Sequence, residues 1–173
     1  MVGALPVVVQ RAAVHLAVAA CLACGGSSAV LAVSGGGKDF SGSSVEGRDF
    51  SGQALKGKEF RGSRGAGANF EGAGLQGCSF FQSDLSNVIF RKADMTGASL
   101  EEAGLDGVDL SDAVLVSSYL SRTIADAKNI EGADFSESVM PEKIQKALCD
   151  RADAKGVNSK TQVETRESLM CPD

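Results

Sequence analysis

Apolar residues recur at every fifth position from Phe40 to Met140, and this period restricts the fold more than any other feature of the chain. A period of five matches neither the 3.6 residues of an amphipathic helix nor the two of a half-buried strand. It predicts a repeat protein in which each five-residue unit contributes one core side chain. Only Gly65 and Ala125 among these positions lack a large side chain. The positions are Phe40, Val45, Phe50, Leu55, Phe60, Gly65, Phe70, Leu75, Phe80, Leu85, Phe90, Met95, Leu100, Leu105, Leu110, Leu115, Leu120, Ala125, Ile130, Phe135 and Met140.

Three other positions of the unit follow rules of their own. Glycine stands two residues after the apolar centre, which indicates a turn with positive φ. Asp or Asn stands one residue before the centre, where its side chain can hydrogen-bond to the turn backbone. A small residue two places before the centre indicates a second inward position. The glycines are at 42, 47, 52, 57, 62, 67, 72, 77, 97, 107 and 132, and Asp or Asn is at 39, 49, 69, 84, 94, 109, 129 and 134.

Together these residues resemble the pentapeptide-repeat signature A(D/N)LxG, seen at 68–72 (Ala-Asn-Phe-Glu-Gly) and at 93–97 (Ala-Asp-Met-Thr-Gly). The resemblance implies an all-β solenoid over residues 38–140: a right-handed quadrilateral β-helix of about five coils, with four units to a coil. Residues 20 apart in the sequence should then stack. Phe40, Phe60 and Phe80 would form one ladder, and Phe50, Phe70 and Phe90 would form the ladder opposite.

Charge is unevenly distributed along the repeats. From 38 to 70 six basic residues meet four acidic ones, whereas from 71 to 140 twelve acidic residues meet four basic ones. This polarity favours an oriented encounter with a charged partner, although solvated faces would look the same. In the first coil Lys38, Arg48 and Lys58 replace the small inward residue, which indicates protection of an exposed end against aggregation, with a partner site as the alternative.

Residues 1–32 read as a cleavable export segment, followed by a linker at 33–37. An apolar run over 12–23 precedes Val30-Leu31-Ala32, which suits a signal peptidase that cuts after Ala32. The run is short and rich in alanine for a membrane anchor. The stretch Val18-Ala19-Ala20-Cys21 also resembles a lipobox, so a bacterial lipoprotein tethered through Cys21 is an alternative.

The segment 141–173 is predicted to cap the last coil. Pro141 suits the start of a helix over 141–152, with Ile144, Ala147 and Leu148 at helical spacing. Cys149 and Cys171 flank this segment, and we expect a disulfide between them that requires an oxidising compartment. Cys78 occupies a small inward position and is expected to be a buried core residue.

One stretch departs from the pattern. Gly65 stands where a core side chain belongs, which predicts a bulged or mobile corner with Arg61 and Arg64 pointing outward. An irregular basic loop on a regular rod is a candidate recognition element, and a tolerated defect is the alternative.

The tail narrows the resemblance further. Leu148-Cys149, the run Ala-Lys-Gly-Val-Asn at 154–158, the run Thr-Arg-Glu-Ser-Leu at 165–169 and Cys171 resemble the tail of thylakoid lumenal pentapeptide-repeat proteins of plants, algae and cyanobacteria. So does the run at 38–42. The resemblance implies a location in the thylakoid lumen; a nuclear-encoded chloroplast protein would need a further transit peptide before Met1.

The composition argues against an enzyme. The sole histidine, His15, lies in the export segment, so the mature chain would have no histidine for acid–base catalysis, a catalytic triad or a metal site. The glycines recur by fives and form no phosphate-binding loop. We therefore expect no catalytic residues, no cofactor, no metal and no small-molecule substrate.

Two binding functions remain. In the first, a monomeric lumenal accessory or assembly factor contacts a protein partner, for example a photosynthetic membrane complex, and no nucleic acid. Its candidate contacts are Phe81, Ile89, Val114, Val116 and Tyr119, with Arg61 and Arg64. In the second, the rod mimics DNA and inhibits a topoisomerase, as the gyrase-protecting members of the family do. The export segment, the expected disulfide and the basic first coil argue against the second function.

Overall fold

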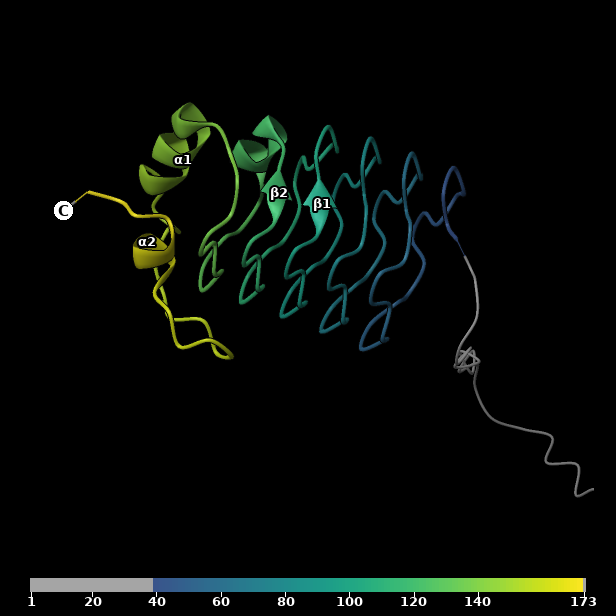
Figure 1. The fold of residues 1–173 in the computed structure, drawn as a ribbon, viewed down its shortest axis with the longest axis horizontal. Helices are drawn as coiled ribbons and strands as arrows, with labels where there is room; N and C mark the ends of the chain where they lie inside the picture. The colour runs from purple at the N-terminus through teal and green to yellow at the C-terminus, as the bar shows by residue number, and fades with distance from the viewer. Residues whose placement is uncertain (1–38, 173) are drawn as a thin grey trace, which may run out of the picture. The chain divides into compact units, whose positions relative to one another are not determined.

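The computed structural model describes residues 39–172, and the predicted export segment, the predicted linker, Lys38 and Cys21 lie outside the described residues. The chain winds into stacked coils with helices at their C-terminal end (Figure 1). The named elements are strands β1 (Ser99–Leu100) and β2 (Tyr119–Leu120), the 3-10 helix η1 (Arg122–Asp126), and helices α1 (Glu142–Cys149) and α2 (Thr165–Ser168). No helix of this described part is long and apolar enough to cross a membrane.

Each five-residue unit is a tight turn. The Ser43 N–H donates to the Phe40 carbonyl at 3.0 Å, and equivalent bonds recur along the coils. The third turn residue has positive φ even where glycine is absent: Lys92 has φ 57° and Glu102 has φ 56°. Each Asp or Asn before a centre accepts a hydrogen bond from the N–H two residues later, as Asp49 does from Ser51 at 2.9 Å. The same bond forms at 39, 69, 84, 94, 109, 129 and 134.

Neighbouring coils pair in parallel with a register of 20 residues. Ser99 pairs with Tyr119 and Leu100 with Leu120. Elsewhere each side contributes a single bridge, such as Asn69 with Ile89, because the turn on either side allows no longer strand. Four units therefore complete one coil. We name the four sides by their centres: side A (40, 60, 80, 100, 120, 140), side B (45, 65, 85, 105, 125), side C (50, 70, 90, 110, 130) and side D (55, 75, 95, 115, 135).

The core is a column of side chains, with phenylalanine in its first half. Phe60 stacks on Phe80 with centroids 4.8 Å apart, and Phe70 stacks on Phe50 at 4.8 Å and on Phe90 at 5.4 Å. Rings of the opposite ladders meet edge to face at 5.6 to 6.0 Å. Both arrangements are favourable for aromatic pairs. The two predicted ladders are thus confirmed.

The prediction of a bulged corner at Gly65 is wrong. Its N–H donates to the Asp84 carbonyl at 2.7 Å, and Arg64 bridges to Ser44 and Asp84, as at any other unit. Gly65 is buried, and an added Cβ would lie 3.2 Å from Cδ2 of Leu85 and 3.5 Å from Cγ2 of Val45. These larger neighbours fill the place of the missing side chain, so the backbone needs no bulge.

The unit at Ala125 does differ from the others. Residues 122–126 form η1, and Ile124, 1% exposed, supplies the inward side chain in place of Ala125. Ser121 begins this helix by accepting a hydrogen bond from the Thr123 N–H. The pattern therefore misplaced the core residue here by one position. Helix α1 packs against η1 at this corner.

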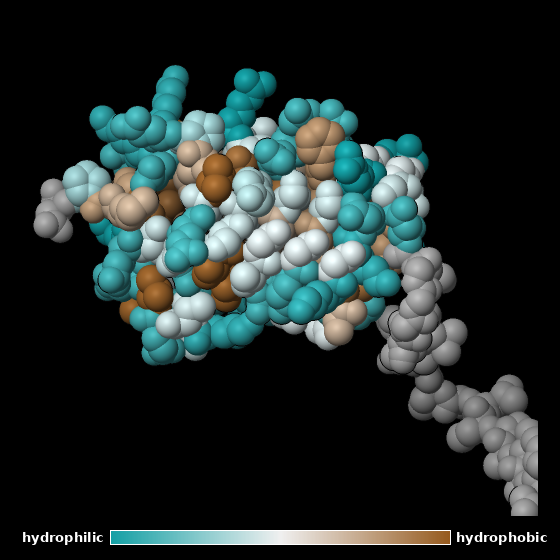
Figure 2. Space-filling model, viewed as in Figure 1, coloured by the Kyte–Doolittle hydropathy of each residue, from teal (hydrophilic) through white to brown (hydrophobic). Residues whose placement is uncertain are grey.

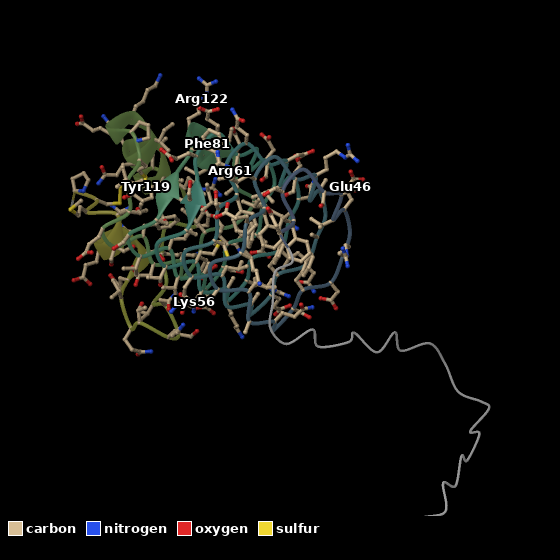
Figure 3. The ribbon with its side chains drawn as sticks, turned by 45° about the vertical axis from the view of Figure 1, so that its right-hand side comes forward. Glu46, Lys56, Arg61, Phe81, Tyr119 and Arg122 are labelled. Carbon is tan, nitrogen blue, oxygen red and sulfur yellow. A yellow bond between two sulfur atoms is a disulfide. The ribbon has the colours of Figure 1, made fainter. Side chains whose placement is uncertain are left out.

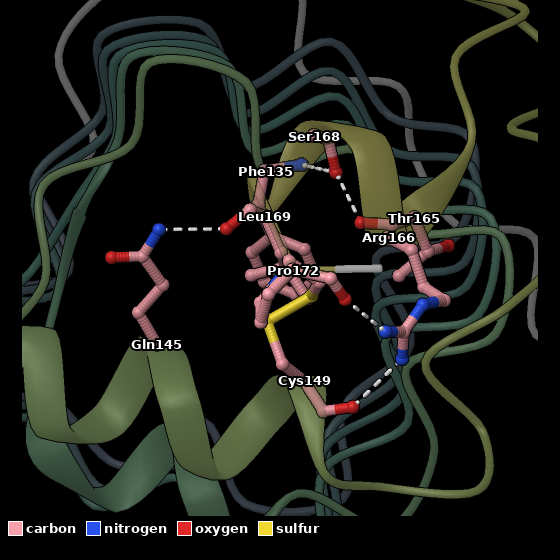
Figure 4. Close-up of a disulfide and its surroundings, with 9 residues drawn as sticks. Phe135, Gln145, Cys149, Thr165, Arg166, Ser168, Leu169 and Pro172 are labelled. Carbon is pink, nitrogen blue, oxygen red and sulfur yellow. Dashed lines mark hydrogen bonds between the residues drawn. A yellow bond between two sulfur atoms is a disulfide. The ribbon is translucent and has the colours of Figure 1, made fainter.

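The C-terminal segment folds back on the last coils. Helix α1 is shorter than the predicted 141–152; Leu148 is buried and Ile144 packs on the core, whereas Ala147 is exposed. A disulfide joins Cys149 to Cys171, with Cα atoms 5.5 Å apart. The Arg166 guanidinium donates to the carbonyls of Cys149 and Pro172, and so ties both ends of this loop together (Figure 4). Helix α2 was not predicted.

Candidate interaction surfaces

The candidate contacts lie on several sides of the rod and form no single surface. Phe81, Tyr119 and Arg61 lie on side A and fall on the same flank of the rod (Figure 3). Ile89 lies on side C and is half-buried, Val116 lies on side D and is half-buried, and Arg64 lies on side B. Only the side-A group therefore brings several predicted contacts together.

The prediction that Val114 faces outward is wrong, because it is 3% exposed. The C-terminal segment crosses side D beside it. Asn158, fully buried, donates through Nδ2 to the carbonyls of Asp112, Ala113 and Gly132 at 2.8 to 3.1 Å. Lys160 pairs with Asp94, one coil before Val114. Side D is thus occupied over its last coils by the chain itself.

Side A carries the most exposed apolar residues of the described coils. Tyr119 is 47% exposed and Val139, its ladder neighbour, is 56% exposed. They line a shallow hollow of about 360 Å³ together with Glu101, Leu120, Met140 and Pro141. In Figure 2 the exposed hydrophobic side chains gather mainly toward the end that carries α1 and α2. The sequence reasoning missed Val139, although its position just before the centre Met140 marks it as outward.

Phe81 lies farther along side A and is partly covered. The Arg61 guanidinium lies over its ring, with Cζ 5.1 Å from the centroid. Such a contact is favourable at a surface and limits the ring area open to a partner. Arg64, on side B, pairs with Glu46 at 3.3 Å, and both side chains are largely exposed. The two arginines do point outward as predicted, yet they belong to different sides and do not form one basic loop.

Two carboxyl groups that contact side chains of the C-terminal segment, those of Asp94 and Asp153, have lowered pKa values. Burial opposes ionisation of Asp94, but hydrogen bonds from Lys160, Thr96 and Gln76 outweigh it and lower its pKa to about 2 from the ordinary 3.8. The Arg151 side chain donates to Asp153 at 2.8 Å and lowers the pKa of that carboxyl. The Lys160–Asp94 pair joins the C-terminal segment to the coils. The Arg151–Asp153 pair lies within that segment, and the same two side chains bond to the Ala125 carbonyl and the Ile130 N–H of the coils.

The described residues offer little chemistry for a ligand. No group of three or more His, Cys, Asp or Glu side chains comes together in the way that a metal ion requires within 39–172. Burial raises the pKa of the Cys78 thiol to about 11, and its Sγ donates to the Leu55 carbonyl. A thiol held protonated is a poor nucleophile.

Comparison with known proteins supports this architecture. A family model for pentapeptide repeats matches residues 49–80 and 78–115. A pentapeptide repeat protein from the thylakoid lumen of Arabidopsis thaliana is similar at 34% identity with a TM-score of 0.74, over 81% of this chain and 98% of that chain. No curated protein matches the chain.

Two further likenesses are weak. Rfr23, a pentapeptide repeat protein from the cyanobacterium Cyanothece 51142, has 19% identity and a TM-score of 0.36 over 57% of this chain and 81% of that chain. QnrB1, a plasmid-mediated fluoroquinolone resistance protein, has 21% identity and a TM-score of 0.28 over 58% of this chain and 59% of that chain. Neither bears on the function of this protein. Pentapeptide repeat proteins form right-handed quadrilateral β-helices. The four-sided coils, the family match and the similarity to the lumenal protein show that this chain belongs to the pentapeptide-repeat family.

Proposed function

We propose that this protein is a non-enzymatic interaction factor of the thylakoid lumen that binds a protein partner through side A of its rod. The observation that carries the proposal is the exposed pair Tyr119 and Val139, which lines a hollow on side A. Apolar residues clustered at a hollow are typical of a protein contact, whereas single exposed ones are ordinary. Phe81 and Arg61 extend the same side away from the hollow.

Two observations support the lumen as the compartment. The relative at 34% identity comes from the thylakoid lumen and is covered over 98% of its length. The disulfide between Cys149 and Cys171 requires an oxidising environment to persist. A bacterial periplasmic or lipid-anchored protein would share the second observation alone.

We further propose that the C-terminal segment acts as a cap on the last coil. An uncovered coil exposes unpaired backbone groups and an apolar core, which favours end-to-end association. Here the Ile130 N–H donates to Asp153, the Gly132 N–H to the Lys155 carbonyl and the Phe135 N–H to Ser168. Within the stack, the equivalent N–H groups donate to carbonyls of the following coil, so these bonds replace the ones that a further coil would make. A capped rod fits a monomer.

Cross-linking in intact thylakoids of the native organism, followed by mass spectrometry, tests the interaction proposal. A variant with Phe81→Ser and Tyr119→Ser should lose its cross-linked neighbour. The matched control, Ile89→Ser with Val116→Ser, changes half-buried apolar residues on sides C and D and should retain it. If the side-A variant keeps every neighbour, side A is not the binding surface. The same spectra report the mature N-terminus, which tests cleavage after Ala32.

A further inference from the structure

The last coil leaves one pairing position open on side A. Within the stack, Val139 joins its coil to the preceding one through two bonds. Its N–H donates to the Ser118 carbonyl at 2.8 Å, and its carbonyl accepts from the Leu120 N–H at 2.9 Å. Ser138 and Met140 lie 20 residues after Ser118 and Leu120, in the last coil. The Ser138 carbonyl and the Met140 N–H would therefore make the same two bonds to a further coil. Neither has a hydrogen-bond partner among residues 39–172.

The other three sides of this end are occupied. On side B the Arg151 guanidinium donates to the Ala125 carbonyl at 2.9 Å. On sides C and D the residues of the C-terminal segment accept from the edge donors at 2.8 to 3.0 Å. Side A is therefore the single described side on which the ladder stops without a substitute partner.

The surroundings of this edge point to a missing chain. Met140 lines the hollow that holds Tyr119 and Val139. Ser138 and Met140 also line a second, smaller hollow, together with Gln145 and Met170 among others. The Ser138 hydroxyl is buried there without a hydrogen-bond partner in the described chain, and Met170 is 77% exposed. A buried polar group without a partner costs stability, so a ligand that satisfied it would be favoured.

We propose that the Ser138 carbonyl and the Met140 N–H form a docking site for an extended segment of a partner protein, which adds one parallel strand to side A. Strand addition of this kind takes its affinity from main-chain hydrogen bonds and its specificity from alternate side chains. The inference rests on the proposed function, because the occupant belongs to a protein partner. A second copy of the rod fits less well, since the C-terminal segment already occupies the edge on the other three sides.

The register specifies the chemistry of the occupant. The residue that bridges Ser138 and Met140 places its side chain next in the row formed by Tyr119 and Val139. An aromatic or β-branched side chain is favoured there by cross-strand packing.

A synthetic peptide tests the site directly. The acetylated peptide Lys-Ser-Tyr-Leu-Lys copies the strand at 118–120, which already pairs with this coil from the other side. Its matched control carries an N-methyl group on the tyrosine nitrogen, which removes the N–H intended for the Ser138 carbonyl. At millimolar peptide, NMR of the full chain should show a shift of the Met140 amide and its slower exchange with solvent. The methylated peptide should produce neither change. The proposal fails if Met140 is unaffected, or if both peptides act equally.

Variants at the edge separate this inference from the proposed function. Met140→Pro removes the edge donor, which has no partner in the described fold, and Met140→Leu keeps it. Peptide binding should be lost in the first variant and retained in the second, with the Tm of each recorded to show that both are folded. If cross-linked neighbours vanish with Phe81→Ser and Tyr119→Ser but persist with Met140→Pro, the side-A function stands and strand addition is refuted.

Discussion

Replacing Phe70 by alanine should destabilise the protein more than almost any other single change. The ring is fully buried and meets four others: it stacks on Phe50 and Phe90 at 4.8 and 5.4 Å, and it meets Phe60 and Phe80 edge to face at 5.6 and 5.9 Å. Truncation of a buried phenylalanine costs about 3–5 kcal/mol, and the cost rises with the cavity that remains. Because stacked coils hold their neighbours in register, the cavity has little room to collapse, so the upper half of this range is expected.

Guanidinium chloride unfolding, followed by far-UV circular dichroism, measures this cost. The control is Phe81→Ala, which removes the same side chain from an outward, half-covered position on side A. That change should cost about 1 kcal/mol, roughly half of the transfer free energy of a fully buried ring. A cost below about 1.5 kcal/mol for Phe70→Ala, or equal costs for the two variants, would refute the assignment of every fifth residue to a shared core.

Four other changes have defined outcomes. Lys92→Gly should raise the free energy of unfolding and Gly97→Ala should lower it, each by about 1 kcal/mol, because both positions have positive φ. Chemical unfolding of both variants measures these changes, and changes of the same sign would contradict the prediction. Cys149→Ser opens a loop with a sequence separation of 22 and should cost about 3 kcal/mol; an unchanged Tm would count against the disulfide. Asp94→Asn should cost about 1 kcal/mol at pH 7, since Lys160 is largely exposed. Asp94 has a depressed pKa, so its contribution is present above 3.8 and is lost as pH falls toward about 2; unfolding measured at pH 7, 4 and 2 should show the gap between wild type and variant closing.

The repeat itself was predictable because one rule acts locally at every unit. The centre must be apolar to fill the column, and the residue before it must accept a turn N–H, as Asp49 does from Ser51. The turn also explains why Lys92 adopts positive φ without glycine: bonds to neighbouring coils fix the backbone whatever the side chain. Gly65 misled the prediction because the pattern does not show that Val45 and Leu85 close the gap.

The surface was less predictable, because it depends on where the C-terminal segment packs against coils that are distant in the sequence. Val114 has the position of an outward residue, yet the segment anchored by Asn158 lies against its side of the rod. The pattern places that asparagine in an irregular tail and shows nothing of its three carbonyl partners. Likewise, the shift from Ala125 to Ile124 accompanies packing of α1 on η1, a contact between segments that the five-residue period does not describe.

The distance between two spin labels tests the central claim, the 20-residue register, most directly. Ser51 and Glu131 are exposed, lie on side C and are 80 residues apart, which is four coils. Four parallel ladder steps of roughly 4.8 Å place their backbones about 19 Å apart. Cysteines introduced at both positions of a chain with Cys21→Ser and Cys24→Ser would carry the labels, with Cys78 buried and the native disulfide intact. A single narrow distribution near 20–25 Å is expected once the label arms are included. A broad distribution, or a mean beyond about 35 Å, would contradict the four-sided coil.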